Sequence, residues 1–291
     1  MSSKNKMKRQ KALKQKFDIT IYNIAASIEL TIALLADLHN RPFEEILNIL
    51  SAQKPDVIAI AGDLVDKKEN DTDDISVHSP NSLELLRACT AIAPTYYALG
   101  NHEWILEDLD IELIKKTGVK LLDNSYAILK ENALIGGLTS ATTTCNQIFR
   151  TEHGDWDWRD RHERAITECK KNRELSRVPD TDWLAKFEKQ NGYKILLCHH
   201  PEYWAVQQPF LSQRSIDLVC AGHGHGGQIR FGNQGIFAPG QGFFPRYTAG
   251  VHRSGNHTLV ISRGLANTAS IPRINNRPEI VFIRLGNYSA K

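Results

Sequence analysis

Short apolar runs recur along the chain from Leu30 onward, and a cluster of polar residues follows each of them. Each run is about five residues long and rich in Ile, Val, Leu, Ala or Tyr, which is typical of strands buried on both faces. The pattern therefore predicts five buried β-strands, at Thr31–Ala36, Val57–Ala61, Thr95–Leu99, Lys194–Leu197 and Ile216–Ala221.

Stretches with helical periodicity lie between the early runs. The predicted helices are Pro42–Gln53, Ser82–Ala91 and Leu106–Thr117. In the first of these, one helical face collects the apolar side chains of Phe43, Ile46, Leu47 and Leu50. Gly118 follows the third and is typical of a helix C-terminus. Strands that alternate with helices predict an α/β protein with substantial parallel pairing.

Other segments depart from this pattern. Lys67–Ser82 is polar and acidic and is predicted to be a loop, whereas Thr139–Asp182 is long and charged and is predicted to be an insertion or cap with a helical stretch around Asp160–Asn172. After Gly226, glycine-rich turns alternate with short apolar runs, which predicts strands and loops. We expect a flexible arm at residues 1–16 and a single domain at 17–291.

The charges are segregated along the chain, although the formal net charge is only +3. Residues 1–16 carry seven basic residues and no acid, and residues 17–217 carry a net charge of −11. Residues 218–278 hold six arginines, no lysine and no acid. The basic arm could contact an anionic membrane surface, but we expect no stable nucleic-acid partner.

Several classes of protein are excluded by the remaining composition. No apolar run reaches the ~18 residues of a membrane span, and no apolar segment follows the basic start as in a secretory signal. The five cysteines are scattered and none forms a CxxC pair, so neither a disulfide framework nor a zinc cluster is expected. We expect reduced thiols and a cytoplasmic protein, with peripheral contact at the inner face of the membrane as an option.

The polar clusters at the ends of the five strands carry the candidate chemistry. In open α/β sheets, ligands bind at the carboxyl ends of the strands. Every cluster supplies an oxygen or imidazole ligand, and such a mixed set suits a divalent metal such as Mn, Fe, Zn or Co. The clusters are Asp37-Leu38-His39, Gly62-Asp63-Leu64-Val65-Asp66, Gly100-Asn101-His102-Glu103, His199-His200-Pro201 and Gly222-His223-Gly224-His225-Gly226-Gly227.

The last cluster also matches the pattern G-x-G-x-x-G of dinucleotide sites. Such a site needs a helix that starts there and an acidic residue about 20 positions later. The sequence that follows has no helical pattern, and no Asp or Glu lies between Asp217 and Glu279. The glycines are better explained as positions where backbone passes close to metals.

Together, the motifs D-x-H, G-D-x-x-D, G-N-H-E, H-x-P and G-H-x-H-G-G-Q resemble those of the calcineurin-like metallophosphoesterases, and the last points to the bacterial YkuE/YaeI-like branch. The resemblance runs from about Tyr22 to Leu285. It implies a four-layer α/β/β/α sandwich in which two mixed sheets are flanked by helices. Gly224 departs from the family pattern, where Thr is usual.

The resemblance also implies a site with two divalent metal ions. One ion would be held by Asp37, His39, Asp63 and His225. The other would be held by Asp63, Asn101, His199 and His223. Asp63 would bridge both ions, and His102 would face the scissile phosphate without being a ligand. Glu103 or Asp66 could orient an imidazole.

The implied reaction is hydrolysis of a phosphodiester or pyrophosphate bond by a metal-bridging hydroxide, with His102 assisting the leaving group. A nucleotide-like diester and a lipid-linked pyrophosphate are both candidate substrates. The alternatives are a protein Ser/Thr phosphatase and a non-catalytic scaffold of the same fold. We hypothesise that one or two of the six arginines grip a substrate phosphate, these being Arg230, Arg246, Arg253, Arg263, Arg273 and Arg277. The oligomeric state and the native metals stay open.

Overall fold

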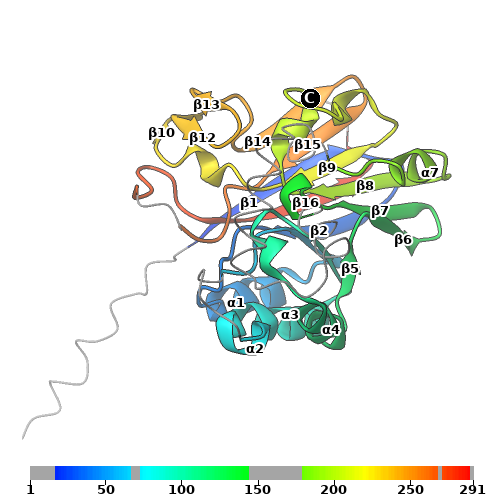
Figure 1. Cartoon of the computed structure of the whole chain (residues 1–291). Coiled ribbons are helices and arrows are strands. Elements are labelled where there is room, and N and C mark those ends of the chain that lie inside the picture. The colour runs from blue at the N-terminus through cyan, green and yellow to red at the C-terminus, as the bar shows by residue number, and fades with distance from the viewer. Residues whose placement is uncertain (1–16, 67–72, 144–178, 268–270, 289–291) are drawn as a thin grey trace, which may run out of the picture.

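Two six-stranded β-sheets stack face to face in the structure (Figure 1). The structure is a computed structural model, and it describes residues 17–66, 73–143, 179–267 and 271–288. Each sheet mixes parallel and antiparallel pairs, and the loops at one end of both sheets carry the polar clusters.

The first sheet has the strand order β1-β16-β2-β3-β4-β5. Strands β2 to β5 are parallel, β16 is antiparallel to β2, and β1 is parallel to β16. The strands are β1 (Asp18–Ala25), β16 (Glu279–Gly286), β2 (Leu30–Leu35), β3 (Val57–Ala61), β4 (Thr95–Ala98) and β5 (Lys120–Leu122).

The second sheet has the strand order β14-β15-β9-β8-β7-β6. Its four central strands are parallel, and the antiparallel strands β14 and β6 form its edges. The strands are β14 (Gly250–Ser254), β15 (His257–Ile261), β9 (Leu218–Ala221), β8 (Tyr193–Cys198), β7 (Ala133–Leu138) and β6 (Ser125–Lys130).

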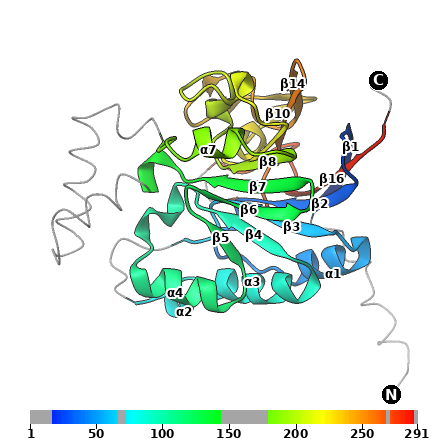
Figure 2. The ribbon, with the colours of Figure 1, turned by 90° about the vertical axis from the view of Figure 1, so that its right-hand side faces the viewer.

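Helices cover the outer face of each sheet (Figure 2). Those on the first sheet are α1 (Glu44–Gln53), α2 (Ile75–His78), α3 (Pro80–Ile92) and α4 (Asp108–Lys116). The second sheet is covered by α7 (Leu184–Glu188) and the 3-10 helices η3 (Pro201–Trp204) and η4 (Leu211–Gln213). In β2, Ile32 and Leu34 face the other sheet, whereas Ala33 and Leu35 face the helices. The predicted four-layer sandwich is confirmed.

All five predicted strands are present, as β2, β3, β4, β8 and β9, and the three predicted helices are α1, α3 and α4. The prediction of a loop at Lys67–Ser82 is wrong for the described residues of this segment, because α2 and the first turn of α3 lie there. Helix α2 begins after Asp74, whose carboxylate accepts a hydrogen bond of 2.8 Å from the Ser76 N–H. Helix α3 begins at Pro80, a residue that is favoured at the first position of a helix.

The remaining predictions concern segments at the margins of the sheets. The predicted helix at Asp160–Asn172 and the arm at 1–16 lie outside the described residues, so the insertion or cap at Thr139–Asp182 stays a prediction. After Gly226 the chain forms two small hairpins before β14. They pair β10 (Arg230–Phe231) with β11 (Gln234–Gly235), and β12 (Phe237–Ala238) with β13 (Gly242–Phe243). None of the described helices has the length and apolar character needed to cross a membrane.

Candidate metal centre

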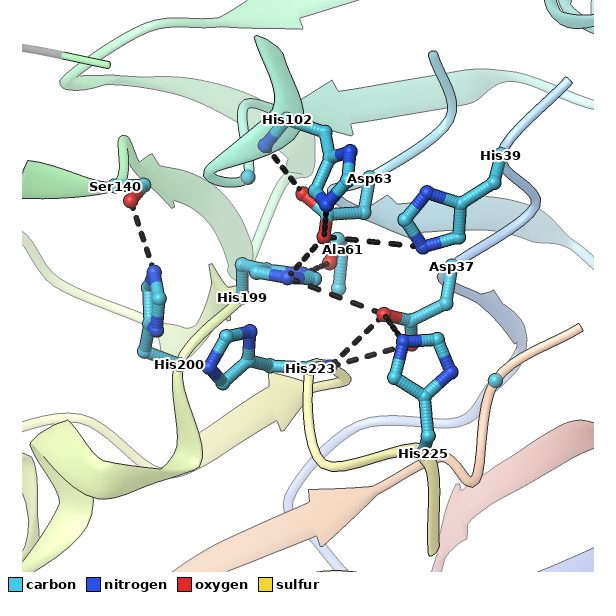
Figure 3. Close-up of polar contacts among 12 residues, drawn as sticks. Asp37, His39, Ala61, Asp63, His102, Ser140, His199, His200, His223 and His225 are labelled. Atoms are coloured by element: carbon cyan, nitrogen blue, oxygen red, sulfur yellow. Dashed lines mark hydrogen bonds and ion pairs between the residues drawn. The ribbon is translucent and has the colours of Figure 1, made fainter. Parts of the chain in front are cut away.

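The loops after five strands converge at one place between the two sheets (Figure 3). Three of these strands, β2, β3 and β4, belong to the first sheet, and β8 and β9 belong to the second. The loops bring together all the predicted acidic and histidine site residues, namely Asp37, His39, Asp63, His102, His199, His223 and His225. Asn101 precedes His102 in the loop after β4.

The backbone of these loops is strained where the side chains point inward. Positive φ is uncommon for residues with a Cβ, and such strain clusters at functional sites. Five of the predicted ligands adopt it, with φ of 57° at Asp37, 50° at His39, 53° at Asp63, 65° at His223 and 43° at His225. Packing from both sheets therefore holds the loops in a conformation that aims the side chains at one another.

Glycines let these loops approach the carboxylates closely. A Cβ added at Gly222 would lie 2.7 Å from Asp37 Oδ2, and a Cβ at Gly100 would collide with Asp63. The segment that matched G-x-G-x-x-G continues into η5 (His225–Gly227), a short 3-10 turn, and then into β10. No dinucleotide-type helix starts there, as expected from the sequence.

Asp37, His39 and His225 form one group whose possible ligand atoms all lie within 4.8 Å of one another. Asp37 Oδ1 lies 3.6 Å from His225 Nε2, and the His39 and His225 rings stack with centroids 5.5 Å apart. These are three of the four residues that the resemblance assigns to the first ion.

Asp63, His199 and His223 form a second group of the same size. Asp63 Oδ2 lies 3.0 Å from His199 Nε2 and 3.9 Å from His39 Nε2, so this one oxygen faces both groups. The His199 Nδ1 lies 2.7 Å from the Ala61 carbonyl oxygen, and an N–H there would orient the ring with Nε2 toward Asp63.

Several buried polar atoms of the site make no hydrogen bond among the described residues. They are both ring nitrogens of His39 and Oδ1 of Asn101. An unsatisfied buried polar atom costs roughly 1–3 kcal/mol, and imidazole nitrogens and amide or carboxylate oxygens are all ligands for divalent metals. The residues present therefore fit divalent ions in both groups.

The shifted pKa values divide the site residues into neutral histidines and one charged pair, Asp63 with His199. Burial lowers the pKa of His39 to about 3 and holds that of His223 well below its usual value, so both rings are neutral. Burial would raise the pKa of Asp63, but the neighbouring His199 holds it well below its ordinary value. Burial would likewise lower the pKa of His199, but Asp63 raises it to about 10. A cation that binds His199 must displace this proton.

Glu103 organises the loops rather than an imidazole, in contrast to the role considered for it. Its buried carboxylate accepts hydrogen bonds from the N–H groups of Asp63 at 2.9 Å and Gly100 at 2.7 Å, and from the Tyr97 hydroxyl at 2.6 Å. It thereby joins the loops after β3 and β4. The other residue considered, Asp66, is exposed.

His102 differs from the other histidines of the site because its side chain is 39% exposed. Its backbone N–H donates to Asp63 Oδ1 at 2.9 Å, and its ring packs edge-on against His39 with centroids 4.5 Å apart. Its Nε2 lies 4.0 Å from Asp63 Oδ2. The ring therefore reaches both the carboxylate shared by the two groups and the solvent.

A third cluster lies beside the second group and was missed in the sequence. His200 turns its Nε2 to the Ser140 hydroxyl at 2.8 Å, and its Nδ1 lies 3.7 Å from Glu202 Oε2. Glu202 is buried, and together with His200 and His223 it offers ligand atoms within 4.8 Å. No periodicity or motif marks Glu202, because its role depends on the distant segment that carries His223.

Only one of the six arginines contacts a predicted ligand in the described interactions. Arg273 places Nη2 3.1 Å from His225 Nδ1 and donates to the Ala266 carbonyl. Its Nε and Nη1 are buried and make no hydrogen bond among the described residues. By contrast, Arg230 donates to backbone carbonyls, and Arg263 pairs with Glu279.

Comparisons with known proteins agree with this geometry. A family model described as calcineurin-like phosphoesterase matches residues 30–227. The uncharacterized metallophosphoesterase YkoQ of Bacillus subtilis is 26% identical over 89% of this chain and 84% of its own length. Phosphodiesterase YaeI of Escherichia coli is 26% identical over 87% of this chain and 81% of its own.

A solved structure, a dimetal phosphatase from Danio rerio, is 11% identical with a TM-score of 0.48, and the match covers 81% of this chain and 87% of the other. The resemblance inferred from the motifs is confirmed by the family model, which spans all five clusters at the strand ends. The chain belongs to the calcineurin-like phosphoesterase family.

Proposed function

We propose that this phosphoesterase binds two divalent metal ions and hydrolyses a phosphodiester or pyrophosphate bond. The position of Asp63 carries the proposal, because its Oδ2 faces His199 of one group and His39 of the other. One carboxylate between two ligand groups is a common way to hold two ions a few ångströms apart. The ligands would be Asp37, His39, Asp63 and His225 for one ion, and Asp63, Asn101, His199 and His223 for the other.

The protein groups around the ions have distinct tasks. Two bound divalent ions would supply Lewis acidity toward the phosphoryl oxygens and would lower the pKa of a water molecule. Asp63 and Asp37 supply the negative charge that retains cations, and Glu103 fixes the loop that carries Asp63. His102 lies at the exposed side of the site, where its ring can donate a proton to the leaving oxygen.

Arg273 is the candidate for binding the substrate phosphate. Its guanidinium lies beside His225, and two of its nitrogens have no hydrogen-bond partner among the described residues. Burial lowers its pKa to about 10, so the group stays charged at neutral pH. An arginine with donors to spare suits the oxygens of a phosphate.

The Arg273→Gln variant should therefore raise the KM for a phosphodiester by roughly 10-fold or more, because a charged hydrogen bond to the substrate is lost. The change in kcat should be smaller. Arg253→Gln is the matched control, because Arg253 is exposed on β14. Equal KM values for the two variants in steady-state assays would contradict this role.

One experiment tests the proposed reaction. Metal content is measured by elemental analysis, and Mn-supported hydrolysis of bis(p-nitrophenyl) phosphate is compared with that of p-nitrophenyl phosphate. We expect two metals per chain and faster turnover of the diester. Faster turnover of the monoester would contradict a diesterase and favour the phosphatase alternative, and activity on neither would favour a non-catalytic scaffold.

The compartment is part of the same proposal. Cys89, Cys198 and Cys220 are buried and form no disulfide, which supports a reducing compartment such as the cytoplasm.

A further inference from the structure

Every exposed phenylalanine in the described part of the chain lies on the two hairpins that follow the metal-site loop. They are Phe231, Phe237, Phe243 and Phe244, and Phe231 and Phe243 are 70% and 75% exposed. Phe237 and Phe243 contact each other across β12 and β13, with ring centroids 5.4 Å apart. Exposure of several large aromatic side chains in one region indicates an interaction surface.

Two exposed isoleucines extend this surface. The segment that carries Ile271 and Ile274 is held against the first hairpin, because the Arg230 N–H donates to the Ile274 carbonyl at 3.0 Å. Figure 1 shows the hairpins and this segment on the same side of the molecule. We define the aromatic surface by its exposed members, Phe231, Phe237, Phe243, Phe244, Ile271 and Ile274.

The segment that carries the aromatic surface contributes charges of a single sign. The surface lies within residues 218–278, which contain six arginines and no acid. Arg246 is exposed two residues after Phe244, and Arg253 is exposed on β14. The partner that such a surface favours is apolar inside and negatively charged outside.

The start of the described chain is near the same region. Arg277 lies 3.4 Å from Asp18, so this segment contacts the point at which the first sixteen residues join the domain. Those residues carry seven basic side chains and no acid. Their charge adds to that of the arginines for any anionic partner.

We propose that the aromatic surface docks this protein onto an anionic lipid bilayer. Phenylalanine and isoleucine side chains enter the boundary between headgroups and acyl chains, and arginines beside them attract anionic headgroups. A nucleic acid would use the arginines and could stack on the phenylalanines, but it would gain little from the two isoleucines.

The docking surface borders the metal centre. Arg273 lies between Ile271 and Ile274 in sequence, and its guanidinium contacts His225. The hairpins likewise begin three residues after η5, which carries His225. A docked molecule would hold the metal centre close to the headgroups, and the surface exists whatever reaction the centre performs.

Vesicle sedimentation of the full chain tests the proposal. The vesicles are phosphatidylcholine alone or mixed with an equal amount of phosphatidylglycerol. We expect the protein to bind the mixed vesicles. Phe243→Ser/Phe244→Ser should weaken this binding by at least about tenfold, because the double variant loses two large apolar side chains that enter the bilayer. Arg246→Gln should weaken binding to the mixed vesicles and reduce its salt dependence.

The matched control is Ile128→Ser, because Ile128 is 71% exposed on the distant edge strand β6. This variant should bind like the parent chain, and all variants should hydrolyse a soluble diester at the parent rate, which shows that they are folded. The proposal is overturned if the parent chain binds neither kind of vesicle, or if Phe243→Ser/Phe244→Ser binds the mixed vesicles as well as Ile128→Ser does. It is also overturned if the double variant changes only self-association or nucleic-acid binding.

Discussion

Asp63 is the residue that lies between the two candidate ligand groups. One of its oxygens faces His39 and His199, and the other accepts the backbone N–H of His102. Its own N–H is held by Glu103, and its φ is 53°. A side chain fixed at so many points has one orientation, which is what a ligand shared by two ions requires.

His102→Ala should separate chemistry from metal binding. We expect the variant to keep its metal content and to lose about 10²–10⁴-fold in kcat, the usual contribution of a positioned acid or base. Elemental analysis and steady-state assays on a diester measure the two quantities.

Asp63→Asn serves as the comparison and should lose metal as well as activity. His257→Ala is the neutral control, because His257 lies at the start of β15 and its ring contacts the Ile216 carbonyl instead of the candidate site. Unchanged turnover in His102→Ala would contradict its role as the acid.

At the scale of the element, the loop after β9 requires glycine at position 222 but not at position 224. Gly222 lies against Asp37, whereas a Cβ at Gly224 would lie 3.4 Å from Thr248 Cα, an ordinary contact. Gly224 also has a φ of −75°, which any residue adopts. The departure from the family's usual Thr at this position is therefore compatible with the fold.

Gly222→Ala and Gly224→Ala form a matched pair that tests this reading. Gly222→Ala should displace the Asp37 carboxylate, lower the metal content and destabilise the fold by about 1–3 kcal/mol, as overpacking does. Gly224→Ala should have the metal content and activity of the parent chain. Similar metal content in both variants would show that the close approach at Gly222 is dispensable.

Asp110 joins α4 to α2. Its carboxylate accepts the N–H of Glu107 at 2.8 Å and the N–H of Ile75 at 2.7 Å, and His78 lies 3.9 Å away. Burial would raise the pKa of Asp110, but His78 and the two N–H groups lower it below the ordinary value. Folding therefore stabilises the ionised form of Asp110 relative to its protonated form.

Asp110→Asn should lower the free energy of unfolding by about 1–3 kcal/mol at neutral pH, because an amide cannot accept both bonds. Because folding lowers the pKa of Asp110, the parent chain should have its full excess in free energy of unfolding above the pKa that Asp110 has in the unfolded chain. This excess should disappear as the pH falls through the pKa that Asp110 has in the folded chain. Urea denaturation at neutral and acidic pH measures this, with the exposed Glu112→Gln as control. A pH-independent difference would contradict the linkage.

Sequence periodicity found most of the strands that are buried on both faces, but it missed the edge strand β1 and the buried strand β7. The runs that became β2, β3 and β9 are continuous and apolar. By contrast, β1 mixes apolar with polar residues and is mostly exposed or half-buried, so it has no clear signal. In β7, two adjacent glycines disguise a buried strand, and Gly137 is needed because a Cβ there would collide with the Leu122 carbonyl.

The candidate ligands were predictable for a related reason. They directly follow strands, so short motifs mark them. The supporting residues were harder to predict. Arg273 was one of six candidate arginines that the sequence could not rank, and the role of Glu202 depends on its contact with His223 from a distant segment. Their positions depend on tertiary contacts that leave no local pattern.

At the scale of the whole molecule, the candidate metal centre draws its residues from both sheets. Asp37, His39 and Asp63 follow strands of the first sheet, whereas His199 and His223 follow strands of the second. An ion bound by both sets resists their separation. Metal binding should therefore stabilise the entire fold and not only its loops.

Metal should raise the Tm by roughly 5–10 °C at a free concentration about 100 times Kd, which corresponds to about 2.7 kcal/mol. Differential scanning calorimetry of the stripped and the Mn-loaded chain measures the shift. Asp63→Asn should lose most of the shift, and His257→Ala should keep it. An equal shift in both variants would place the stabilising metal elsewhere.

The last strand has a consequence for synthesis of the protein. Strand β16 lies between β1 and β2, and its Val281, Ile283 and Leu285 fill the core between the sheets. Its pairing with β1 joins Asp18 to Glu279, so β1 gains this partner only once residues 279–286 have been made. Strand β2, which leads into Asp37 and His39, has no neighbour on that side until then. A chain without β16 would therefore hold the loop that carries Asp37 and His39 on an unfinished sheet.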